Sequence, residues 1–151
     1  MSDATNDPAE PTFENVLYAT EGPLAIITIN RPEKHNAISL ATLDDLHGAV
    51  DLAADDDNIR VIAITGAGGK AFAAGSDLSE VVDRDFKKAL EPIVQGLAEK
   101  LERTPKPTIA AIDGICMGGG LEVALGCDLR VATPQSRFAT PEGKLGIIPG
   151  G

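Results

Sequence analysis

Two glutamates and two glycine-containing turns are the residues of this chain whose types and order could do chemistry. Gly118-Gly119-Gly120 lies between an apolar stretch at residues 108–113 and a helix-like run at residues 121–127. We expect a strand that leads into glycines at the start of a helix, where backbone N–H groups lack partners and face the positive helix end. That arrangement suits an anion or a developing oxyanion. Glu122 comes about one turn into the predicted helix, so we expect it close to the same place.

The second glycine-containing turn is Ala74-Gly75-Ser76-Asp77, which follows another apolar stretch. Two backbone N–H groups from separate loops can form an oxyanion hole, in which each donor contributes roughly 3–4 kcal/mol in known enzymes. The alternative is that both glycine clusters are only tight turns, because glycine usually serves turn geometry. The Ser76 hydroxyl has no obvious base, so its backbone N–H group is the better candidate for a role.

Glu122 and Glu142 form the candidate acid–base pair, the first on the helix behind the glycines and the second in a Pro-Glu-Gly turn. A facing pair could hold one water molecule and move its protons. Close carboxylates do not easily ionise together, so one of them would keep a proton near neutral pH. The alternative is two solvated side chains, since glutamate is mostly exposed in proteins.

Other common site chemistries find no support in the sequence. The glycines before Lys70 lack the earlier glycine of a P-loop, and no G-x-G-x-x-G is present, which disfavours nucleotide binding. His35 and His47 have no evident partner, and no cluster with metal-ligand spacing occurs, so we expect no metal. We expect His47 to be a surface or packing histidine.

The composition bounds the class of protein. The chain has 151 residues, 43% of them apolar and only 3% aromatic, which is enough for one domain with an aliphatic core. A net charge of −10 argues against nucleic acid or an anionic membrane as partner. An anionic substrate remains possible if a local basic patch forms from Arg31, Lys34, Lys70 or Lys144. Two cysteines in apolar stretches predict buried, reduced thiols in a cytoplasmic protein, and no run is apolar enough to span a bilayer.

The elements that must position these residues alternate between strand and helix. We predict a hairpin at residues 16–20 and 24–30, a helix capped by Ser39 that runs to about Ala54, and a second helix within residues 85–103, with Pro92 at its start or at a kink. Further strands are predicted at residues 61–65, 129–132 and 137–139. This alternation favours an α/β fold with parallel strands. Residues 1–12 are predicted to be a disordered arm and residues 13–151 one domain. The turn residues at the end of the chain indicate a cut inside that domain.

Together, several motifs in the same order resemble those of the enoyl-CoA hydratase/isomerase (crotonase) family. Residues 71–78, Ala-Phe-Ala-Ala-Gly-Ser-Asp-Leu, resemble the family's first oxyanion-loop motif, and residues 110–122 resemble its second. Residues 127–132 and 138–146 continue the match in order. Asn30-Arg31-Pro32 and Asn36-Ala37 are similar to the family's early loop. The likeness covers nearly all of the chain after the first dozen residues.

The resemblance implies a fold and a set of site residues. It implies a spiral of ββα units that is incomplete at its C-terminal, helical part, and a coenzyme A thioester as substrate. The backbone N–H groups of Ser76 and Gly119 would hold the thioester oxygen, and Glu122 and Glu142 would match the two acid–base glutamates of the hydratases. Substrate contacts would come from Ala74, Gly75, Ser76, Asp77, Leu78, Ser79, Gly118 and Gly119. In the early loop, Arg31 and Lys34 would approach the phosphates of the coenzyme.

The resemblance also implies a reaction. Water would add across the 2,3 double bond of a 2-enoyl-CoA to give a 3-hydroxyacyl-CoA, with no metal and no cofactor beyond the coenzyme A of the substrate. It implies fatty acid metabolism and a homotrimer or hexamer for the full-length form. The alternatives are isomerisation of the double bond, dehydration of a specialised acyl-CoA, and a non-catalytic acyl-CoA-binding protein.

Overall fold

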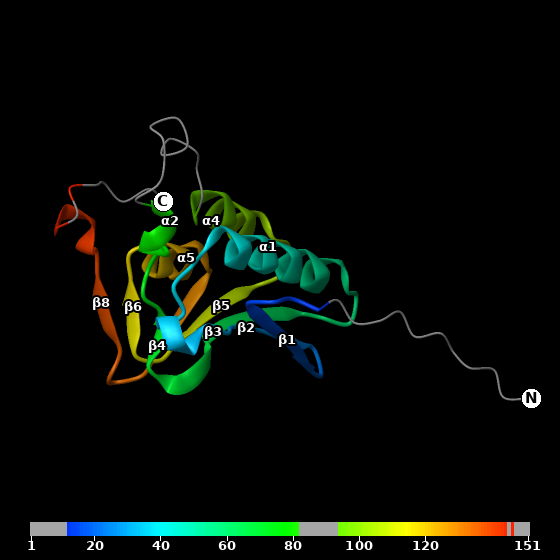
Figure 1. Cartoon of the computed structure of the whole chain (residues 1–151). Coiled ribbons are helices and arrows are strands. Elements are labelled where there is room, and N and C mark those ends of the chain that lie inside the picture. Colours follow the sequence, from blue (N-terminus) through cyan, green and yellow to red (C-terminus); the bar gives the residue numbers. More distant parts are fainter. Residues whose placement is uncertain (1–11, 82–93, 145, 147–151) are drawn as a thin grey trace, which may run out of the picture.

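A five-stranded sheet forms the base of the molecule (Figure 1). The computed structural model describes residues 12–81, 94–144 and 146. The strand order is β1-β2-β3-β5-β7, with bounds Val16–Glu21, Leu24–Ile29, Val61–Gly66, Thr108–Ile112 and Leu129–Ala132. β1 and β2 are antiparallel, and every other neighbouring pair is parallel. The predicted hairpin and the predicted parallel α/β layout are confirmed.

Helices cover one face of this sheet. α1 (Leu40–Asp55) packs on β1 and β2 and against α4 (Val94–Arg103), which in turn packs against α5 (Gly119–Gly126). Alternate strand residues are fully buried on this side, among them Ile27, Ile62 and Ala110. Leu46, Val50 and Leu97 meet them from the helices and are equally buried. The core is therefore aliphatic, as the composition predicts.

The predicted start of the first helix is confirmed in detail. Ser39 is the N-cap of α1, and its side chain accepts a hydrogen bond of 3.1 Å from the Thr42 backbone N–H. The second predicted helix is confirmed for residues 94–103. Its proposed start or kink at Pro92 lies outside the described residues, as does nearly all of the predicted N-terminal arm.

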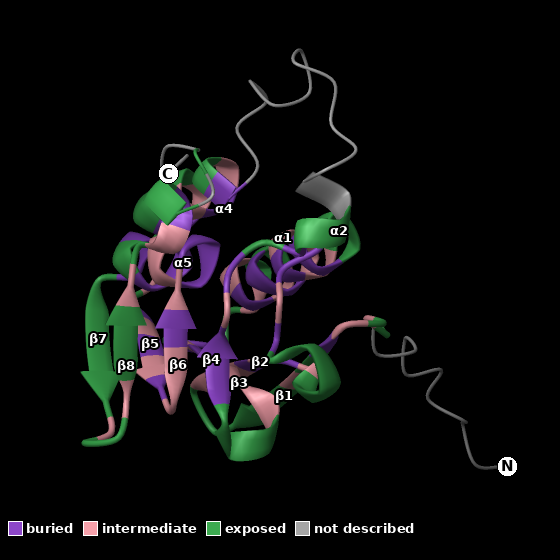
Figure 2. Ribbon diagram, turned by 60° about the vertical axis from the view of Figure 1, so that its left-hand side comes forward, coloured by how far each residue is buried: buried purple, intermediate pink, exposed green. Residues whose placement is uncertain are grey.

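A second, three-stranded sheet holds the elements that were predicted less well. β4 (Ala71–Ala73), β6 (Ile115–Met117) and β8 (Arg137–Ala139) are parallel, with β6 in the middle (Figure 2). We predicted a single strand leading directly into the glycines, and this is wrong. β5 ends at Ile112, the chain turns at Gly114, and β6 is a separate strand. A three-residue strand is too short for a recognisable alternation of apolar and polar residues.

The two sheets alternate along the chain. β3, β4 and α2 (Leu78–Val81) form one strand–strand–helix unit, and β5, β6 and α5 form the next. β7, β8 and the short helix η3 (Pro141–Lys144) follow in the same order. This repetition is the spiral of ββα units expected from the family resemblance. It places the turns after β4, β6 and β8 on one side of the small sheet (Figure 2).

Gly114 gives a test of how tightly the two sheets approach each other. It has φ of 75°, and a methyl group placed on it would overlap the Lys70 carbonyl oxygen. We expect Gly114→Ala to lower the free energy of unfolding by about 1–3 kcal/mol for the strained backbone, plus a steric cost. Gly96→Ala is the matched control, because Gly96 lies in α4 with open space around it. That change should stabilise the protein by up to about 1 kcal/mol. Urea denaturation of both variants checks the prediction, and equal effects would contradict it.

Candidate active site

The two predicted oxyanion turns lie side by side because the strands before them are parallel neighbours. β4 leads to Gly75 and Ser76, and β6 leads to Gly118 and Gly119. A methyl group placed on Gly119 would lie 3.5 Å from the Ser76 amide nitrogen, and one on Gly75 would lie 3.8 Å from the Gly119 amide nitrogen. Gly75 has φ of 114° and Gly118 has φ of 50°, conformations that favour glycine. The glycines therefore serve both the turns and their close approach.

The amide groups of these turns are left without protein acceptors. Ile38 forms a parallel bridge with Ser76, in which its N–H donates to the Gly75 carbonyl and its carbonyl accepts from the Asp77 N–H. In such a bridge the N–H of the middle residue, Ser76, points to the opposite side. The Gly119 N–H is in the first turn of α5, where no intrahelical acceptor exists. Within the described part of the chain, neither amide has a hydrogen-bond acceptor.

Glu142 reaches the same place from the third turn. β8 pairs with β6, and the Gly118 N–H donates to the Ala139 carbonyl at 3.1 Å. The Glu142 Oε1 atom lies 2.9 Å from the position that a methyl group on Gly118 would occupy. The residue is only 8% exposed, and its Oε2 atom is buried with no hydrogen-bond partner among the described residues. A buried carboxyl oxygen without a partner is costly in a stable fold and is typical of functional sites.

Glu122 is joined to Gly118 through the backbone of α5. It lies in the first turn of α5, is half-buried, and its backbone N–H donates to the Gly118 carbonyl at 3.0 Å. Glu122 thus follows Gly118 within one helical turn, whereas Glu142 reaches Gly118 through its side chain. Two backbone amides, the Glu142 carboxyl group and the N-terminus of α5 lie around this glycine, and such a group could polarise a carbonyl oxygen and move protons beside it.

The other predicted binding residues follow β4 along the first turn. Ala74 is half-buried and donates its N–H to the His35 carbonyl, and Leu78 is 52% exposed. The Ser79 hydroxyl donates to an Asp77 carboxylate oxygen at 2.7 Å. The side chain of Asp77 is thus occupied within the protein, and its other oxygen accepts from Arg31 and Lys34. The Ser79 hydrogen bond, followed by those of Arg31 and Lys34, holds the pKa of Asp77 well below its usual range.

Asn36 is the residue near the site that sequence reasoning missed. It is fully buried, has φ of 56°, and its amide donates to the Ala67 and Ala71 carbonyls. Its side-chain oxygen accepts from the Arg31 N–H at 3.0 Å. A single asparagine in a polar loop carries little signal, although asparagine tolerates left-handed backbone better than most residues. Lys70 and Lys144, also considered for a basic patch, are exposed and form no ion pair in the described part of the chain.

Neither a metal site nor a membrane-spanning helix is found in the residues that the structure describes. Among them, no group of three or more histidine, cysteine, aspartate or glutamate side chains could hold a metal ion. No described helix is both long enough and apolar enough to cross a bilayer. His47 lies on α1, where burial and the nearby Lys100 lower its pKa, as expected for a packing histidine.

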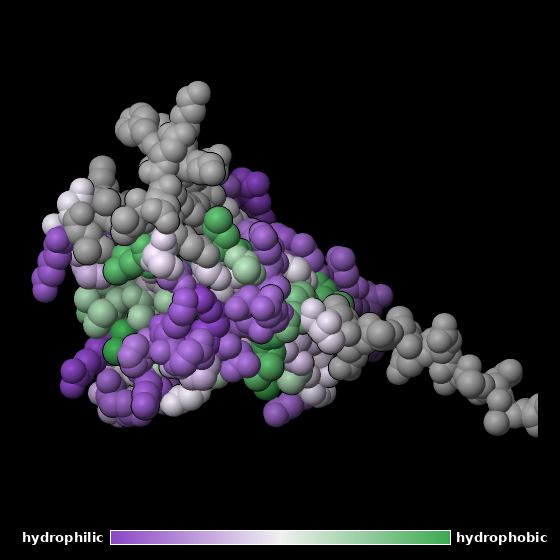
Figure 3. Space-filling view, viewed as in Figure 1, coloured by the Kyte–Doolittle hydropathy of each residue, from purple (hydrophilic) through white to green (hydrophobic). Residues whose placement is uncertain are grey.

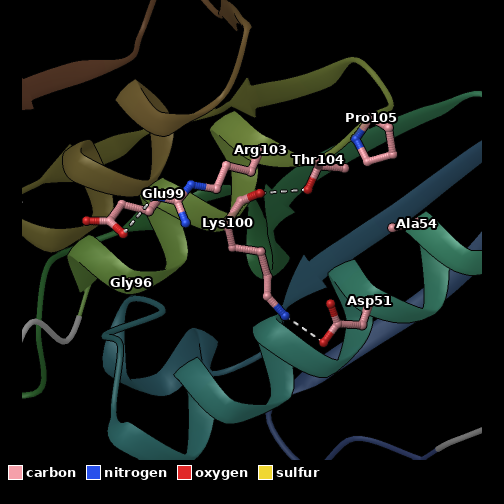
Figure 4. Close-up of a pocket in the computed structure, with 8 residues that line it drawn as sticks. All are labelled: Asp51, Ala54, Gly96, Glu99, Lys100, Arg103, Thr104 and Pro105. Atoms are coloured by element: carbon pink, nitrogen blue, oxygen red, sulfur yellow. Dashed lines mark hydrogen bonds and ion pairs between the residues drawn. The ribbon is translucent and has the colours of Figure 1, made fainter.

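An open hollow of about 390 Å³ between α1 and α4 shares no lining residue with this site (Figure 4). Two ion pairs occur among its lining side chains, Lys100 with Asp51 at 2.5 Å and Arg103 with Glu99 at 3.9 Å. The charged side chains of the hollow are therefore paired with each other. Around Gly118, in contrast, two amides and a carboxyl oxygen have no hydrogen-bond partner among the described residues. We therefore place the candidate active site at Gly118.

The repeated strand–strand–helix units and the turns gathered at one edge of the small sheet define a class of spiral α/β protein. Comparison with known proteins identifies the family. The sequence model of the enoyl-CoA hydratase/isomerase family matches residues 19–151, so the chain belongs to this family.

Similar proteins and solved structures support the same family. The chain is 38% identical over 140 residues to the short-chain-enoyl-CoA hydratase of Clostridium acetobutylicum and 42% identical over 138 residues to the 2,3-dehydroadipyl-CoA hydratase of Escherichia coli. Each match covers 91% of this chain and 54% of the relative. The crystal structure of enoyl-CoA hydratase from Bacillus anthracis superposes with a TM-score of 0.85 at 36% identity, over 91% of this chain and 54% of that one. The chain thus spans about half the length of the relatives that it matches.

The two cysteines give a test of the packing behind the glycines. Cys116 lies in β6, its thiol contacts the Gly120 carbonyl oxygen, and Cys127 follows α5. Both are free and buried, and burial raises the pKa of each thiol to about 11. Because the thiolate is the reactive form, both should resist alkylation by iodoacetamide at pH 8 in the folded protein. In urea, where the pKa returns to about 8.5, both should react fully. Mass spectrometry counts the modified thiols, and rapid labelling of the folded protein would contradict this packing.

Proposed function

We propose that this chain binds a 2-enoyl-CoA thioester around Gly118 and adds water across its 2,3 double bond to give a 3-hydroxyacyl-CoA. The observation that carries the proposal is the pair of amides, Ser76 and Gly119, beside the buried carboxyl oxygen of Glu142, all three without a hydrogen-bond partner among the described residues. The chain is similar to proteins named as enoyl-CoA, crotonyl-CoA and dehydroadipyl-CoA hydratases, which supports the same reaction.

The two amides are suited to hold the acyl oxygen. In the proposed complex the thioester oxygen accepts hydrogen bonds from the Ser76 and Gly119 N–H groups, and the positive end of α5 lies beside it. Withdrawal of electrons toward this oxygen makes carbon 3 of the enoyl group electrophilic. Negative charge builds up on the oxygen as the nucleophile attacks, so the hydrogen bonds strengthen in the transition state. Each donor of this kind contributes roughly 3–4 kcal/mol in known enzymes.

The two glutamates supply the proton transfers in this proposal. Glu122 and Glu142 together orient one water molecule, and one carboxylate removes a proton as the water oxygen bonds to carbon 3. The thioester enolate that results takes a proton at carbon 2, so that water is added and nothing is oxidised or reduced. Protein side chains and backbone carry every step, and the coenzyme A is part of the substrate.

The remaining binding contacts are proposed along the turn after β4. The backbone near Ala74 lies near the adenine, and Ser76, Asp77, Leu78 and Ser79 follow the acyl and pantetheine parts of the substrate. Gly75 and Gly118 leave room for close approach of the thioester. We further propose a cytoplasmic enzyme of fatty acid metabolism, and a homotrimer or hexamer for the full-length form.

Loss of crotonyl-CoA absorbance tests the reaction, with the glutamates replaced one at a time. Glu122→Gln and Glu142→Gln should each lower kcat by about 10²–10⁴-fold, because each removes a proton-transfer group while keeping the side-chain size. Glu99→Gln is the matched control, since Glu99 lies on α4 in the hollow of Figure 4, and its turnover should be unchanged.

Product analysis separates the alternatives. A hydrated product from a 2-enoyl thioester supports the proposal, whereas only double-bond migration from a 3-enoyl thioester would replace it with an isomerase. Binding of crotonyl-CoA without turnover, at an affinity that neither Gln variant changes, would indicate a non-catalytic acyl-CoA-binding protein.

A further inference from the structure

The loop of residues 31–38 is held against the turn that carries Ser76. Three backbone hydrogen bonds join them: Ala74 N–H to the His35 carbonyl at 3.0 Å, Ile38 N–H to the Gly75 carbonyl at 2.8 Å, and Asp77 N–H to the Ile38 carbonyl at 2.8 Å. These bonds flank Ser76 on both sides. The direction of the Ser76 N–H therefore depends on the position of this loop.

The loop itself has a backbone that needs support. His35 and Asn36 have φ of 51° and 56°, so two consecutive residues other than glycine are left-handed. Such a conformation costs roughly 1–2 kcal/mol for each residue and persists only where the surroundings determine it. The Asn36 side chain supplies part of that support through its bonds to the Arg31 N–H and to the Ala67 and Ala71 carbonyls.

Arg31 joins the loop to the turn through its side chain. Its Nη1 atom donates to the Ala37 carbonyl at 2.6 Å, and its Nη2 atom donates to the Asp77 carboxylate at 3.0 Å. Ala37 and Asp77 are the neighbours of the bridged residues Ile38 and Ser76. One planar guanidinium thus spans both strands of the bridge, which a lysine could not do with the same geometry.

Burial makes this contact more than a surface ion pair. The side chains of Arg31 and Asp77 are 13% and 10% exposed, whereas Lys34, the second cation at Asp77, is 51% exposed. Breaking a buried pair leaves an uncompensated charge and is more costly than losing an exposed one. The surface over this loop is hydrophilic (Figure 3), and the exposed fractions make Arg31 the buried cation beneath it and Lys34 the exposed one.

We propose that Arg31 and Asp77 are positioning residues, which hold the Ser76 N–H in line with the Gly119 N–H so that both reach one acyl oxygen. This proposal rests on the function proposed above, and in it the side chains of Arg31 and Asp77 act on the backbone of the turn and not on the acyl oxygen. It assigns Arg31 to the protein's own backbone and carboxylate, in place of the phosphate contact implied by the family resemblance. Lys34, which is half exposed, is the residue of this loop left available to solvent.

Two coenzyme A ligands distinguish positioning from phosphate binding. One is crotonyl-CoA, and the other is its thioether analogue, in which a methylene group replaces the carbonyl. Arg31→Met and Asp77→Asn should each weaken crotonyl-CoA binding by about tenfold, the value of one hydrogen bond. Binding of the thioether should change less than twofold, because it has no acyl oxygen to orient. Equal weakening of both ligands by Arg31→Met would overturn the proposal in favour of a phosphate contact.

A second measurement reports on Ser76 without any ligand. In ¹⁵N NMR spectra, Arg31→Met and Asp77→Asn should shift the amide signals of Gly75 and Ser76 and speed their hydrogen exchange, while signals of the buried strand β3 stay unchanged. Arg31→Lys should restore part of the effect. Lys100→Ala breaks another ion pair between distant segments, with Asp51, and is the matched control that should leave these signals and both affinities unchanged.

The two measurements keep the proposals separable. If wild-type protein binds both ligands equally, the proposed oxyanion hole is wrong, and the NMR shifts alone decide whether Arg31 and Asp77 position Ser76. If the Gly75 and Ser76 signals do not move in either variant, the positioning role is wrong, whatever the affinities. Unfolding of a variant would appear as loss of the β3 signals, and Arg31→Lys then provides the comparison.

Discussion

The parallel pairing of β4, β6 and β8 is the constraint on which the site depends. Parallel strands end at the same edge of a sheet, so the turns that follow them must meet there. Gly75 and Ser76, Gly118 and Gly119, and Glu142 follow the three strands in that order. Gly118 and Glu142, which are 43 and 67 positions after Gly75, are therefore brought to one place by the pairing of these strands. The register of these pairs, Ala71 with Ile115 and Ile115 with Arg137, sets how far along the edge each turn lies.

The site also requires backbone segments to pack closely against one another, and this explains why glycine occurs at several positions around the small sheet. A methyl group on Gly120 would overlap the Ala73 carbonyl, and one on Gly66 would overlap the carbonyls of Ala71 and Phe72. Gly114 has the same relation to Lys70. These three glycines fit the small sheet against its neighbours, whereas Gly75 and Gly118 shape the site. Within the cluster Gly118-Gly119-Gly120, Gly118 therefore shapes the site and Gly120 allows the close packing of backbones. The sequence alone does not distinguish these two roles.

Local signals in the sequence predicted the longer elements well. α1 could be placed within one residue because Ser39 caps it and its apolar residues recur at helical spacing. The hairpin was marked by Glu21-Gly22-Pro23 between two apolar runs. β6 was missed because three residues carry no period, and α5 begins at Gly119, two residues earlier than expected, because glycine is a poor helix former in local terms.

What the sequence could not supply were the contacts between distant segments. Arg31 lies 46 residues before Asp77, and nothing local shows that its side chain is directed at the turn after β4. Asn36 likewise bonds to Ala67 and Ala71, which lie more than 30 residues further along the chain. Glu122 was expected near the glycines because it follows them by about one helical turn, whereas no spacing in the sequence placed Glu142 there. Pattern reasoning finds groups with chemical capacity, but tertiary pairing decides which of them meet.

The charge of the molecule gives the arrangement a further physical reason. A chain with a net charge of −10 has few cations to spare for an acyl oxygen, and Arg31 and Lys34 are both paired with Asp77. Backbone amides avoid this problem, because their dipoles are fixed by the fold and need no counter-charge. A cation placed at the same point would also attract the neighbouring carboxylates and close the site on itself. In the proposed site, neutral donors allow two glutamates to lie beside the oxyanion hole without pairing with it, and Arg31 acts on the backbone that directs one of those donors.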